Sequence, residues 1–275
     1  MTRGTLWHEV NHLPVYWSKL VRNKMPPFEA LKFQFGENSM QYGIYLKPLK
    51  PITKIILYFH GGAWMVGRPE MYRFSITHFL EQGYAVFLPT HRRVPRHSFK
   101  DIRQDVNLAT LAVFDLLRKE ELSNLPIILG GISSGGHLAA SLFFDQGELK
   151  EMGLDQHPFA GLMTFAAPLD LSKMKWTPVL FRLAGNSLGK RFAKASVINH
   201  LKNPPAKPVF GVHGTTDGLA SYESGKSFFD KLQQIQPELT TFHTIEKGSH
   251  LDAIEWTHTD NQMRTDILEW LKRIE

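Results

Sequence analysis

Short apolar runs and longer amphipathic stretches alternate along the chain from residue 54 onward. The run from Lys54 to Phe59 is almost continuously apolar, which is typical of a strand covered on both of its faces. Similar runs follow at residues 84–88, 126–129, 161–165 and 208–212, and a weaker one at residues 241–245. Helical stretches separate most of these runs, at residues 101–119, 134–145, 221–234 and 260–274. Because strands alternate with helices, the pattern predicts a mostly parallel sheet joined by right-handed crossovers.

The first fifty residues show a different pattern. We expect a short helix that stops at residues 25–27, which read Met-Pro-Pro. Apolar and polar positions then alternate over residues 28–35 and 41–47, with a Gly-Glu-Asn turn signal at residues 36–38. This pattern predicts an antiparallel hairpin at one edge of the sheet.

Residues 171–205 carry several aromatic side chains but no strand pattern, so we expect a helical, cap-like excursion over the sheet. No repeat or linker divides the chain. The sequence therefore predicts one α/β domain over residues 1–275, in which residues 1–50 form an N-terminal arm and edge hairpin. The domain is expected to have about eight strands in a twisted sheet, helices on both faces and a small helical cap.

Composition limits the chemistry. Of the 275 residues, 43% are hydrophobic and 21% are charged, which suits a folded domain with a large core. The chain contains no Cys, which excludes a thiol nucleophile, a disulfide scaffold, a Cys-ligated zinc and an iron–sulfur cluster. Any covalent catalysis must therefore use an oxygen or an amine nucleophile.

The net charge of +6 raises the question of a nucleic-acid partner. The basic residues are scattered, and their densest cluster (Arg92, Arg93, Arg96 and His97) lies in one loop without interleaved aromatics. A solvated loop is the ordinary interpretation of this cluster, and attraction of an acidic substrate is the alternative. We predict no nucleic-acid partner.

The sequence predicts no membrane association. The N-terminus lacks an apolar signal-peptide core, and no run of about 18 apolar residues occurs anywhere in the chain. We therefore expect a cytoplasmic protein whose partner is a small-molecule substrate. The pattern leaves open whether the protein is a monomer or a homodimer.

A G-x-S-x-G motif follows one of the predicted buried strands. It reads Gly131-Ile132-Ser133-Ser134-Gly135 and leads directly into a predicted helix. A nucleophilic serine on a strained strand-to-helix turn needs glycines two residues away on each side, which selects Ser133. The alternative is a Gly/Ser turn that only caps a helix.

Residues 60–64, which read His-Gly-Gly-Ala-Trp, come directly after the strand that ends at Phe59. Acyl transfer needs backbone amides aimed at the developing oxyanion. We expect the amides of Gly62 and Ala63, joined by that of Ser134, to supply them. Taken alone, a Gly-Gly pair at a strand end is most often an ordinary turn.

The base and the orienting acid expected beside a serine nucleophile are His250 and Asp217. Each follows a predicted strand, and the carboxyl ends of parallel strands meet at one edge of the sheet. A single histidine is more often a surface or core group, but the chain order Ser133, Asp217, His250 is the one this kind of sheet uses. The three residues are therefore predicted to form a catalytic triad.

These motifs resemble the α/β-hydrolase superfamily over roughly residues 50–275, in particular the hormone-sensitive-lipase-like carboxylesterases and the neighbouring arylformamidases. The esterases typically carry HGGG, whereas Ala63 and Trp64 are closer to the HGGxW loop of the arylformamidases. Ile132 stands where the family commonly has an acidic residue or His, and Arg96 where it commonly has Glu. The resemblance implies an α/β-hydrolase fold, and these departures concern the substrate more than the triad.

Residues 8–12 read His-Glu-Val-Asn-His, the H-E-x-x-H pattern of zinc proteases. That site requires a stable helix and a third ligand, but Pro14 follows closely in an N-terminal segment expected to be mobile. We therefore interpret the segment as a capping arm and predict no metal and no other cofactor.

Three aromatic residues are candidates for the substrate pocket: Trp64, Trp176 and Phe181. Trp176 and Phe181 lie in the predicted helical excursion, where packing in the core is an equally good interpretation. The sequence does not decide whether this excursion is a lid.

The expected function is hydrolysis of small carboxylic esters by a serine hydrolase that forms an acyl-enzyme. An arylformamidase, which would cleave N-formylkynurenine-type amides, is the alternative suggested by Trp64. An alternative of another class is a catalytically silent ligand-binding protein with the same fold.

Overall fold

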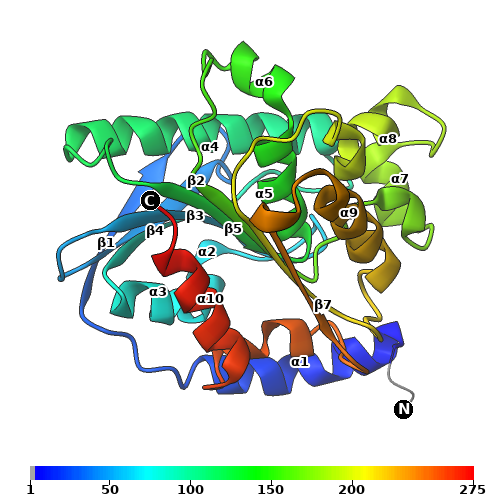
Figure 1. The fold of residues 1–275 in the computed structure, drawn as a ribbon, viewed down its shortest axis with the longest axis horizontal. Helices are drawn as coiled ribbons and strands as arrows, with labels where there is room; N and C mark the ends of the chain where they lie inside the picture. Colours follow the sequence, from blue (N-terminus) through cyan, green and yellow to red (C-terminus); the bar gives the residue numbers. More distant parts are fainter. Residues whose placement is uncertain (1–3) are drawn as a thin grey trace.

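The computed structural model of the chain describes residues 4–275. Its centre is an eight-stranded sheet with the strand order β1-β2-β4-β3-β5-β6-β7-β8, surrounded by helices (Figure 1). The six strands from β3 to β8 run parallel to one another, whereas β1 pairs antiparallel with β2 and β2 pairs antiparallel with β4. The predicted α/β fold with a mostly parallel sheet is therefore confirmed.

The parallel strands lie where apolar runs predicted them. They are β3 (Lys54–Phe59), β4 (Tyr84–Pro89), β5 (Ile127–Ile132), β6 (Gly161–Phe165), β7 (Val209–Gly214) and β8 (Thr240–Ile245). Side chains of β3 alternate between two separate cores: Ile55 and Leu57 face one, whereas Ile56 and Tyr58 face the other. A continuous apolar run is needed here because both faces of the sheet are covered.

The edge hairpin also agrees with its prediction. It consists of β1 (Phe28–Gln34) and β2 (Tyr42–Pro48), and β2 continues the sheet by pairing antiparallel with β4. Most of β1 is exposed because it is the edge strand, whereas β2 is largely buried. The hairpin therefore closes one side of the sheet.

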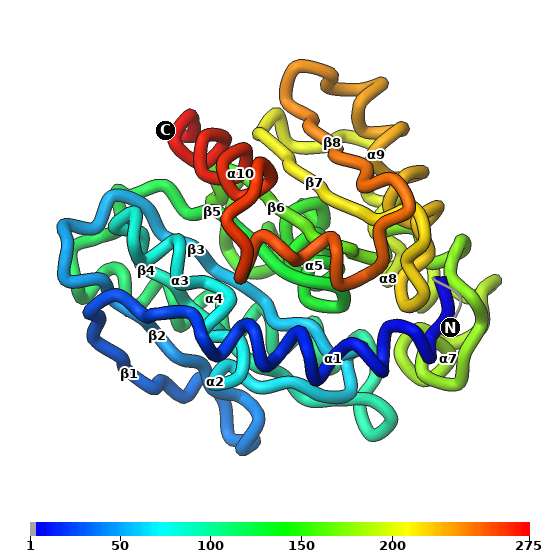
Figure 2. Tube along the Cα trace, turned by 90° about the horizontal axis from the view of Figure 1, so that it is seen from below, coloured from blue at the N-terminus to red at the C-terminus, as the bar shows by residue number. Residues whose placement is uncertain are grey.

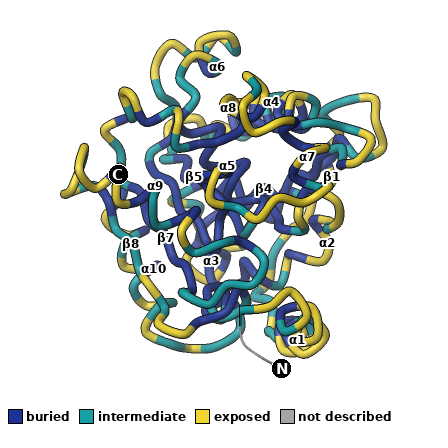
Figure 3. Tube along the Cα trace, turned by 90° about the vertical axis from the view of Figure 1, so that its right-hand side faces the viewer, coloured by how far each residue is buried: buried dark blue, intermediate teal, exposed yellow. Residues whose placement is uncertain are grey.

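The helices form a layer on each face of the sheet. One core contains side chains from α4 (Phe99–Lys119), α5 (Ser134–Phe144) and α9 (Tyr222–Ile235). The other contains side chains from α1 (Leu6–Leu20), α3 (Thr77–Glu81) and α10 (Gln262–Lys272). Figure 3 shows the strands between these layers as the buried centre of the molecule. Two short helices, α2 (Pro69–Tyr72) and α6 (Gln146–Glu151), complete the loops beside the sheet.

Residues 171–205 are helical, as expected. They contain α7 (Pro178–Ala184), α8 (Lys190–Ala195) and two 3-10 turns. Leu183 and Phe192 are buried in the same core as α5 and α9, so this segment packs as part of one helical layer.

The N-terminal segment forms the short helix that the sequence predicts, but the helix is docked on the rest of the protein and is not a mobile arm. Residues Leu6–Leu20 form the continuous helix α1, which includes Pro14 and begins with the side chain of Thr5 accepting from the amide of His8. Figure 2 shows α1 lying along one side of the molecule, next to the segment that follows β8. Contacts with distant parts of the chain hold it there: the hydroxyls of Tyr16 and Thr257 lie 3.2 Å apart. This docking stabilises a helix that its own sequence, with an internal proline, favours only weakly.

Along residues 4–275, no helix has both the length and the apolar character needed to cross a membrane. The cytoplasmic location and the oligomeric state stay predictions.

Candidate active site

The predicted nucleophile lies on a strained turn between β5 and α5. Ser133 has φ 54° and ψ −124°, in a region of backbone conformation that non-glycine residues rarely adopt. Its amide donates to the carbonyl of Phe165 at 2.7 Å, which holds the turn against β6. A Cβ atom on Gly135 would lie 2.1 Å from the carbonyl oxygen of Phe59, so only glycine allows this close approach. The G-x-S-x-G pattern therefore has a steric cause in this structure.

Asp217 and His250 are brought together by the loops after β7 and β8. The Nδ1 of His250 lies 2.7 Å from Oδ2 of Asp217, whose side chain is fully buried. The amides of Leu219 and Ala220 each donate to Oδ1 at 2.8 Å. Because an ionised carboxylate only accepts hydrogen bonds, Nδ1 of His250 carries the proton and Nε2 is left as the basic nitrogen.

A second histidine, which the sequence analysis did not single out, also contacts the acid. The Nε2 of His213 lies 3.1 Å from Oδ2 of Asp217 and 2.9 Å from the carbonyl oxygen of Ala220. His213 is the penultimate residue of β7 and is buried. Its position four residues before Asp217 could have indicated a contact with the acid, but one histidine among 13 does not stand out in the sequence.

The electrostatics of the pair favour an ionised acid beside a basic imidazole. Burial alone would raise the pKa of Asp217, but hydrogen bonds and charge from His250 and His213 hold it well below its usual range. Burial alone would lower the pKa of His250, but the charge and hydrogen bond of Asp217 raise it above the usual value of 6.5, with a smaller contribution from Glu9. Asp217 therefore stabilises the protonated form of the His250 imidazole.

The loop after β3 has the backbone conformation expected of an anion-binding turn. Gly62, Ala63 and Trp64 have φ values of 129°, 52° and 58°. Within residues 4–275, the amides of Gly62 and Ala63 donate to no other protein atom. Ser134 is the first residue of α5, so its amide has no preceding helical turn to donate to. The three predicted oxyanion donors are thus free to bind a ligand.

The buried side chain of His60 forms hydrogen bonds that hold this loop in place. Its Nδ1 donates to the carbonyl of Gly61 at 2.8 Å, and its Nε2 accepts from the hydroxyl of Thr90 at 3.0 Å. Burial lowers the pKa of His60 to about 3, with further lowering from His91, so the ring stays neutral and keeps this arrangement. The histidine before the two glycines is therefore a structural support of the loop.

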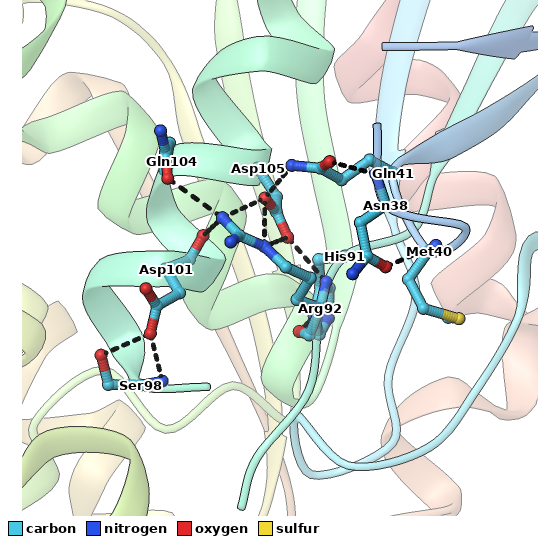
Figure 4. A network of polar contacts seen from close by, with 9 residues as sticks. All are labelled: Asn38, Met40, Gln41, His91, Arg92, Ser98, Asp101, Gln104 and Asp105. Atoms are coloured by element: carbon cyan, nitrogen blue, oxygen red, sulfur yellow. Dashed lines mark hydrogen bonds and ion pairs between the residues drawn. The ribbon is translucent and has the colours of Figure 1, made fainter. Parts of the chain in front are cut away.

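The basic cluster after β4 supports the same loop and is only partly solvated, which corrects the interpretation of residues 92–97 as a solvated loop. Arg92 Nε donates to both oxygens of Asp105 on α4, and Gln41 from the hairpin donates to Oδ1 at 2.7 Å (Figure 4). The amide of Val94 in turn donates to the carbonyl of Trp64 at 3.2 Å. The network shown in Figure 4 consists of Asn38, Met40, Gln41, His91, Arg92, Ser98, Asp101, Gln104 and Asp105.

Asp105→Ala is expected to lower the free energy of unfolding by about 3–5 kcal/mol, because it leaves a partly buried arginine and a buried amide without their acceptor. Chemical denaturation measures this change. The matched control is Asp115→Ala, which removes an exposed ion pair with Arg118 and is expected to cost less than about 1 kcal/mol. Equal losses in the two variants would contradict a structural role for the network.

Ser133 and His250 border one cavity of about 420 Å³. Trp64 also borders it, as predicted. Trp176 and Phe181 do not: their rings are about half exposed and contact each other, with centroids 5.9 Å apart. This corrects their predicted place in the pocket: Trp176 lies before α7 and Phe181 lies on it, and both rings lie at the protein surface instead of beside Ser133.

The cavity wall that the sequence analysis missed comes from α1. Val10, Leu13, Tyr16 and Trp17 line the cavity on that side. The remaining lining residues are Gly61, Gly62, Ala63, Met65, Val66, Gly67, Met71, Tyr72, Ile132, Pro168, Met174, Leu219, Ala220, Leu251 and Ile254. No Asp, Glu, Lys or Arg side chain from the described residues borders the cavity. It is therefore an uncharged, largely apolar pocket of the size that suits a small ligand.

The H-E-x-x-H segment does not form a metal site in the part of the chain that the structure describes. Across residues 4–275, no group of three or more His, Cys, Asp or Glu side chains is placed to hold a metal ion. The Nδ1 of His12 donates to the carbonyl of His8 at 2.7 Å, within the same helix. The Glu9 side chain is instead buried and points away from both histidines to distant loops.

A mostly parallel sheet that holds a serine on a strained turn at its carboxyl edge, with an acid and a histidine after later strands, is the α/β-hydrolase fold. The chain belongs to the BD-FAE family, whose sequence model matches residues 43–232, well over half of the chain. No curated protein matches the chain in sequence.

Solved structures with this fold include several esterases. Esterase B from Lactobacillus rhamnosis is 17% identical, with a TM-score of 0.73 over 96% of this chain and 91% of its own. A truncated carbohydrate esterase from gut microbiota is 19% identical, with a TM-score of 0.73 over 90% of this chain and 98% of its own. A hormone-sensitive lipase from a metagenome library is 18% identical, with a TM-score of 0.68 over 95% and 91% of the two chains. At these identities the likeness concerns the fold. The relation to arylformamidases stays a prediction.

Proposed function

We propose that this protein is a serine esterase that hydrolyses small, uncharged carboxylic esters through an acyl-enzyme. The observation that carries the proposal is the shared cavity: Ser133 and the Asp217-bound His250 both border it, next to the free amides of Gly62 and Ala63. Family membership and the esterase names of several structural neighbours support the same reaction class.

The reaction uses two matched half-cycles. The hydroxyl oxygen of Ser133 attacks the ester carbonyl while Nε2 of His250 takes the hydroxyl proton. The amides of Gly62, Ala63 and Ser134 donate to the oxyanion of the tetrahedral intermediate. The C–O bond to the alcohol then breaks, and the alcohol leaves with the proton from His250.

Water completes the cycle on the acyl-enzyme. His250 takes a proton from the water, whose oxygen attacks the acyl carbonyl, and then returns the proton to the oxygen of Ser133 as the acid leaves. Asp217 stabilises the positive imidazolium in both half-cycles. No step requires a metal or a cofactor.

The cavity favours an ester over the arylformamidase alternative. N-formylkynurenine carries an ammonium and a carboxylate, and its binding in a pocket without charged side chains would cost their hydration. An uncharged acyl or alcohol group loses no such hydration and gains from burial against Leu13, Trp17 and Ile254.

A substrate series tests the proposal. We expect p-nitrophenyl esters of acetate to octanoate to show a burst of p-nitrophenol and turnover, with kcat/KM rising along the shorter chains as apolar area is buried. The matched control is a p-nitrophenyl ester with a carboxylate at the acyl end, which we expect to react at least about 100-fold more slowly. Faster cleavage of N-formylkynurenine than of any ester would favour the formamidase. Failure of a fluorophosphonate to label the protein would favour a catalytically silent protein.

A further inference from the structure

Glu9 is a buried carboxylate that the proposed reaction does not use. Its side chain is inaccessible to solvent although it lies in α1, most of which is exposed. Oε1 accepts from the amide of His250 at 2.9 Å and from the amide of Gly218 at 3.2 Å. One oxygen therefore binds the backbone of the base and the backbone of the residue that follows the acid.

The two loops that Glu9 joins carry the whole acid–base pair. Gly218 follows Asp217 in the loop after β7, and His250 lies in the loop after β8. The contact is tight because a Cβ atom on Gly218 would lie 2.6 Å from the carbonyl oxygen of Thr5, the residue that caps α1. The start of α1 is thus packed directly against the backbone that presents the acid.

The second oxygen of Glu9 indicates an electrostatic role. Oε2 is buried, and among the described residues it has no hydrogen-bond partner. Asp217 from the loop after β7 and Glu9 from α1 are the two carboxylates whose charge raises the pKa of the His250 imidazole, and both contact His250, at its ring and at its backbone amide. Burying a carboxylate oxygen without a hydrogen-bond partner costs stability. An electrostatic effect on the nearby His250 would explain why the protein keeps a carboxylate at this position.

We propose that Glu9 is a positioning residue for the Asp217–His250 pair. It holds the two loops at a fixed separation and places a second negative charge near the imidazole. Because Glu9 lies one residue before Val10 of the cavity wall, the same contact docks the substrate pocket and sets the base. The kinetic tests of this inference rest on the proposed function. The inference also predicts the pKa of the His250 imidazole, which can be measured without a substrate.

Two substitutions separate the hydrogen bonds from the charge. In Glu9→Gln, the amide oxygen still accepts from both backbone amides while the charge is lost. We expect kcat to stay within about tenfold of wild type. We also expect the acid limb of the pH profile, the pH at which kcat/KM falls to half its maximum on the acid side, to move to lower pH by about half a unit or more. The sign follows because a negative neighbour raises the pKa of a histidine, so its removal lowers that pKa and leaves the base neutral at lower pH.

Glu9→Ala removes the hydrogen bonds as well as the charge. We expect kcat to fall about 10- to 100-fold, because a shift of the imidazole by a fraction of an ångström is sufficient for a loss of this size. KM should rise because α1 lines one wall of the pocket, but less than kcat falls, since the walls from the oxyanion loop and Ser133 do not contact Glu9.

Asn23→Ala is the matched control for a purely structural role. Asn23 lies three residues beyond α1 and also ties the N-terminal segment to distant backbone, donating to the carbonyls of Phe74 at 3.0 Å and Thr257 at 2.7 Å, but it contacts neither Asp217 nor His250. We expect this variant to lower the melting temperature while kcat and the acid limb stay as in wild type. If Glu9→Ala and Asn23→Ala change activity equally, or if neither Glu9 variant changes kcat or the acid limb, the proposal is wrong.

An NMR titration of the His250 imidazole tests the inference apart from the proposed function. In Glu9→Gln the measured pKa of His250 should be lower than in wild type, and in Asn23→Ala it should be unchanged. Identical titrations in wild type and Glu9→Gln would overturn the electrostatic role even if the protein cleaves no ester. If the wild type cleaves no ester but the titration shifts as expected, the proposed function fails while the placement of Glu9 stands. Glu9→Gln is close in shape to the native residue, so it serves even if Glu9→Ala does not fold.

Discussion

Ser133→Ala is expected to lower kcat for a p-nitrophenyl butyrate substrate by about 10⁴- to 10⁶-fold, which is the scale at which loss of a triad serine acts. The physical reason is that the neighbouring hydroxyl, that of Ser134, is buried and does not border the cavity, so it cannot replace Ser133 as the nucleophile. Residual activity above that of water would come from binding and from the oxyanion amides, which the substitution leaves in place. Steady-state rates and intact-protein mass spectrometry after fluorophosphonate treatment measure the effect, and the added mass should be lost together with the activity.

The control for this experiment is Ser141→Ala. Ser141 lies on α5, eight residues beyond the proposed nucleophile, and its hydroxyl is buried without a hydrogen-bond partner among the described residues. It does not border the cavity. This variant should label and turn over like wild type. If Ser133→Ala retained more than about one tenth of the wild-type kcat, Ser133 would not be the nucleophile.

Asp217→Asn is expected to lower kcat by about 10⁴-fold at neutral pH. The asparagine amide cannot accept from Nδ1 of His250 when its NH₂ group faces the ring, so the imidazole takes the other tautomer and presents a protonated Nε2 to Ser133. Without the acid, burial is left to lower the pKa of His250, so the remaining activity should have its acid limb at lower pH than wild type.

The control is Asp170→Asn, which changes another buried carboxylate near the carboxyl edge of the sheet. Asp170 accepts from Ser172 and Ser227 and does not border the cavity. We expect its kcat to stay within about threefold of wild type, with a loss limited to stability because its hydrogen bonds are only weakened. Equal losses of kcat in both variants would mean that Asp217 acts only through folding.

The sheet and the triad candidates could be predicted because their signals are local. Each parallel strand is buried on both faces, so its apolar run is visible in the sequence, and β3 and β6 match their predicted bounds to the residue. The strained turn at Ser133 is flanked by glycines because other backbone atoms lie so close that a Cβ atom at these positions would clash with them. Asp217 and His250 follow strands whose order along the chain is enough to bring them to one edge.

The parts of the site that escaped prediction depend on contacts between distant segments. Glu9 meets residues more than two hundred positions away, and nothing around it in the sequence indicates that meeting. Phe181 has the apolar character of a pocket residue, but composition does not say toward which side the short helix α7 turns its ring. In the sequence Arg92 resembles a surface charge, because its ion pair with Asp105 forms only when α4 packs beside the loop.

The way α1 is attached has a consequence for the order in which the chain assembles. Trp17 near the end of α1 packs against Tyr72, and Asn23, three residues beyond α1, donates to the carbonyl of Phe74, so part of this segment has partners close enough in sequence to be met early during synthesis. The end that carries Glu9 must wait for the loops after β7 and β8, which are among the last parts made, and closing so long a loop is slow. Until then the apolar wall of the pocket is uncovered. Glu9 can therefore support the Asp217–His250 pair only after both of these loops are in place.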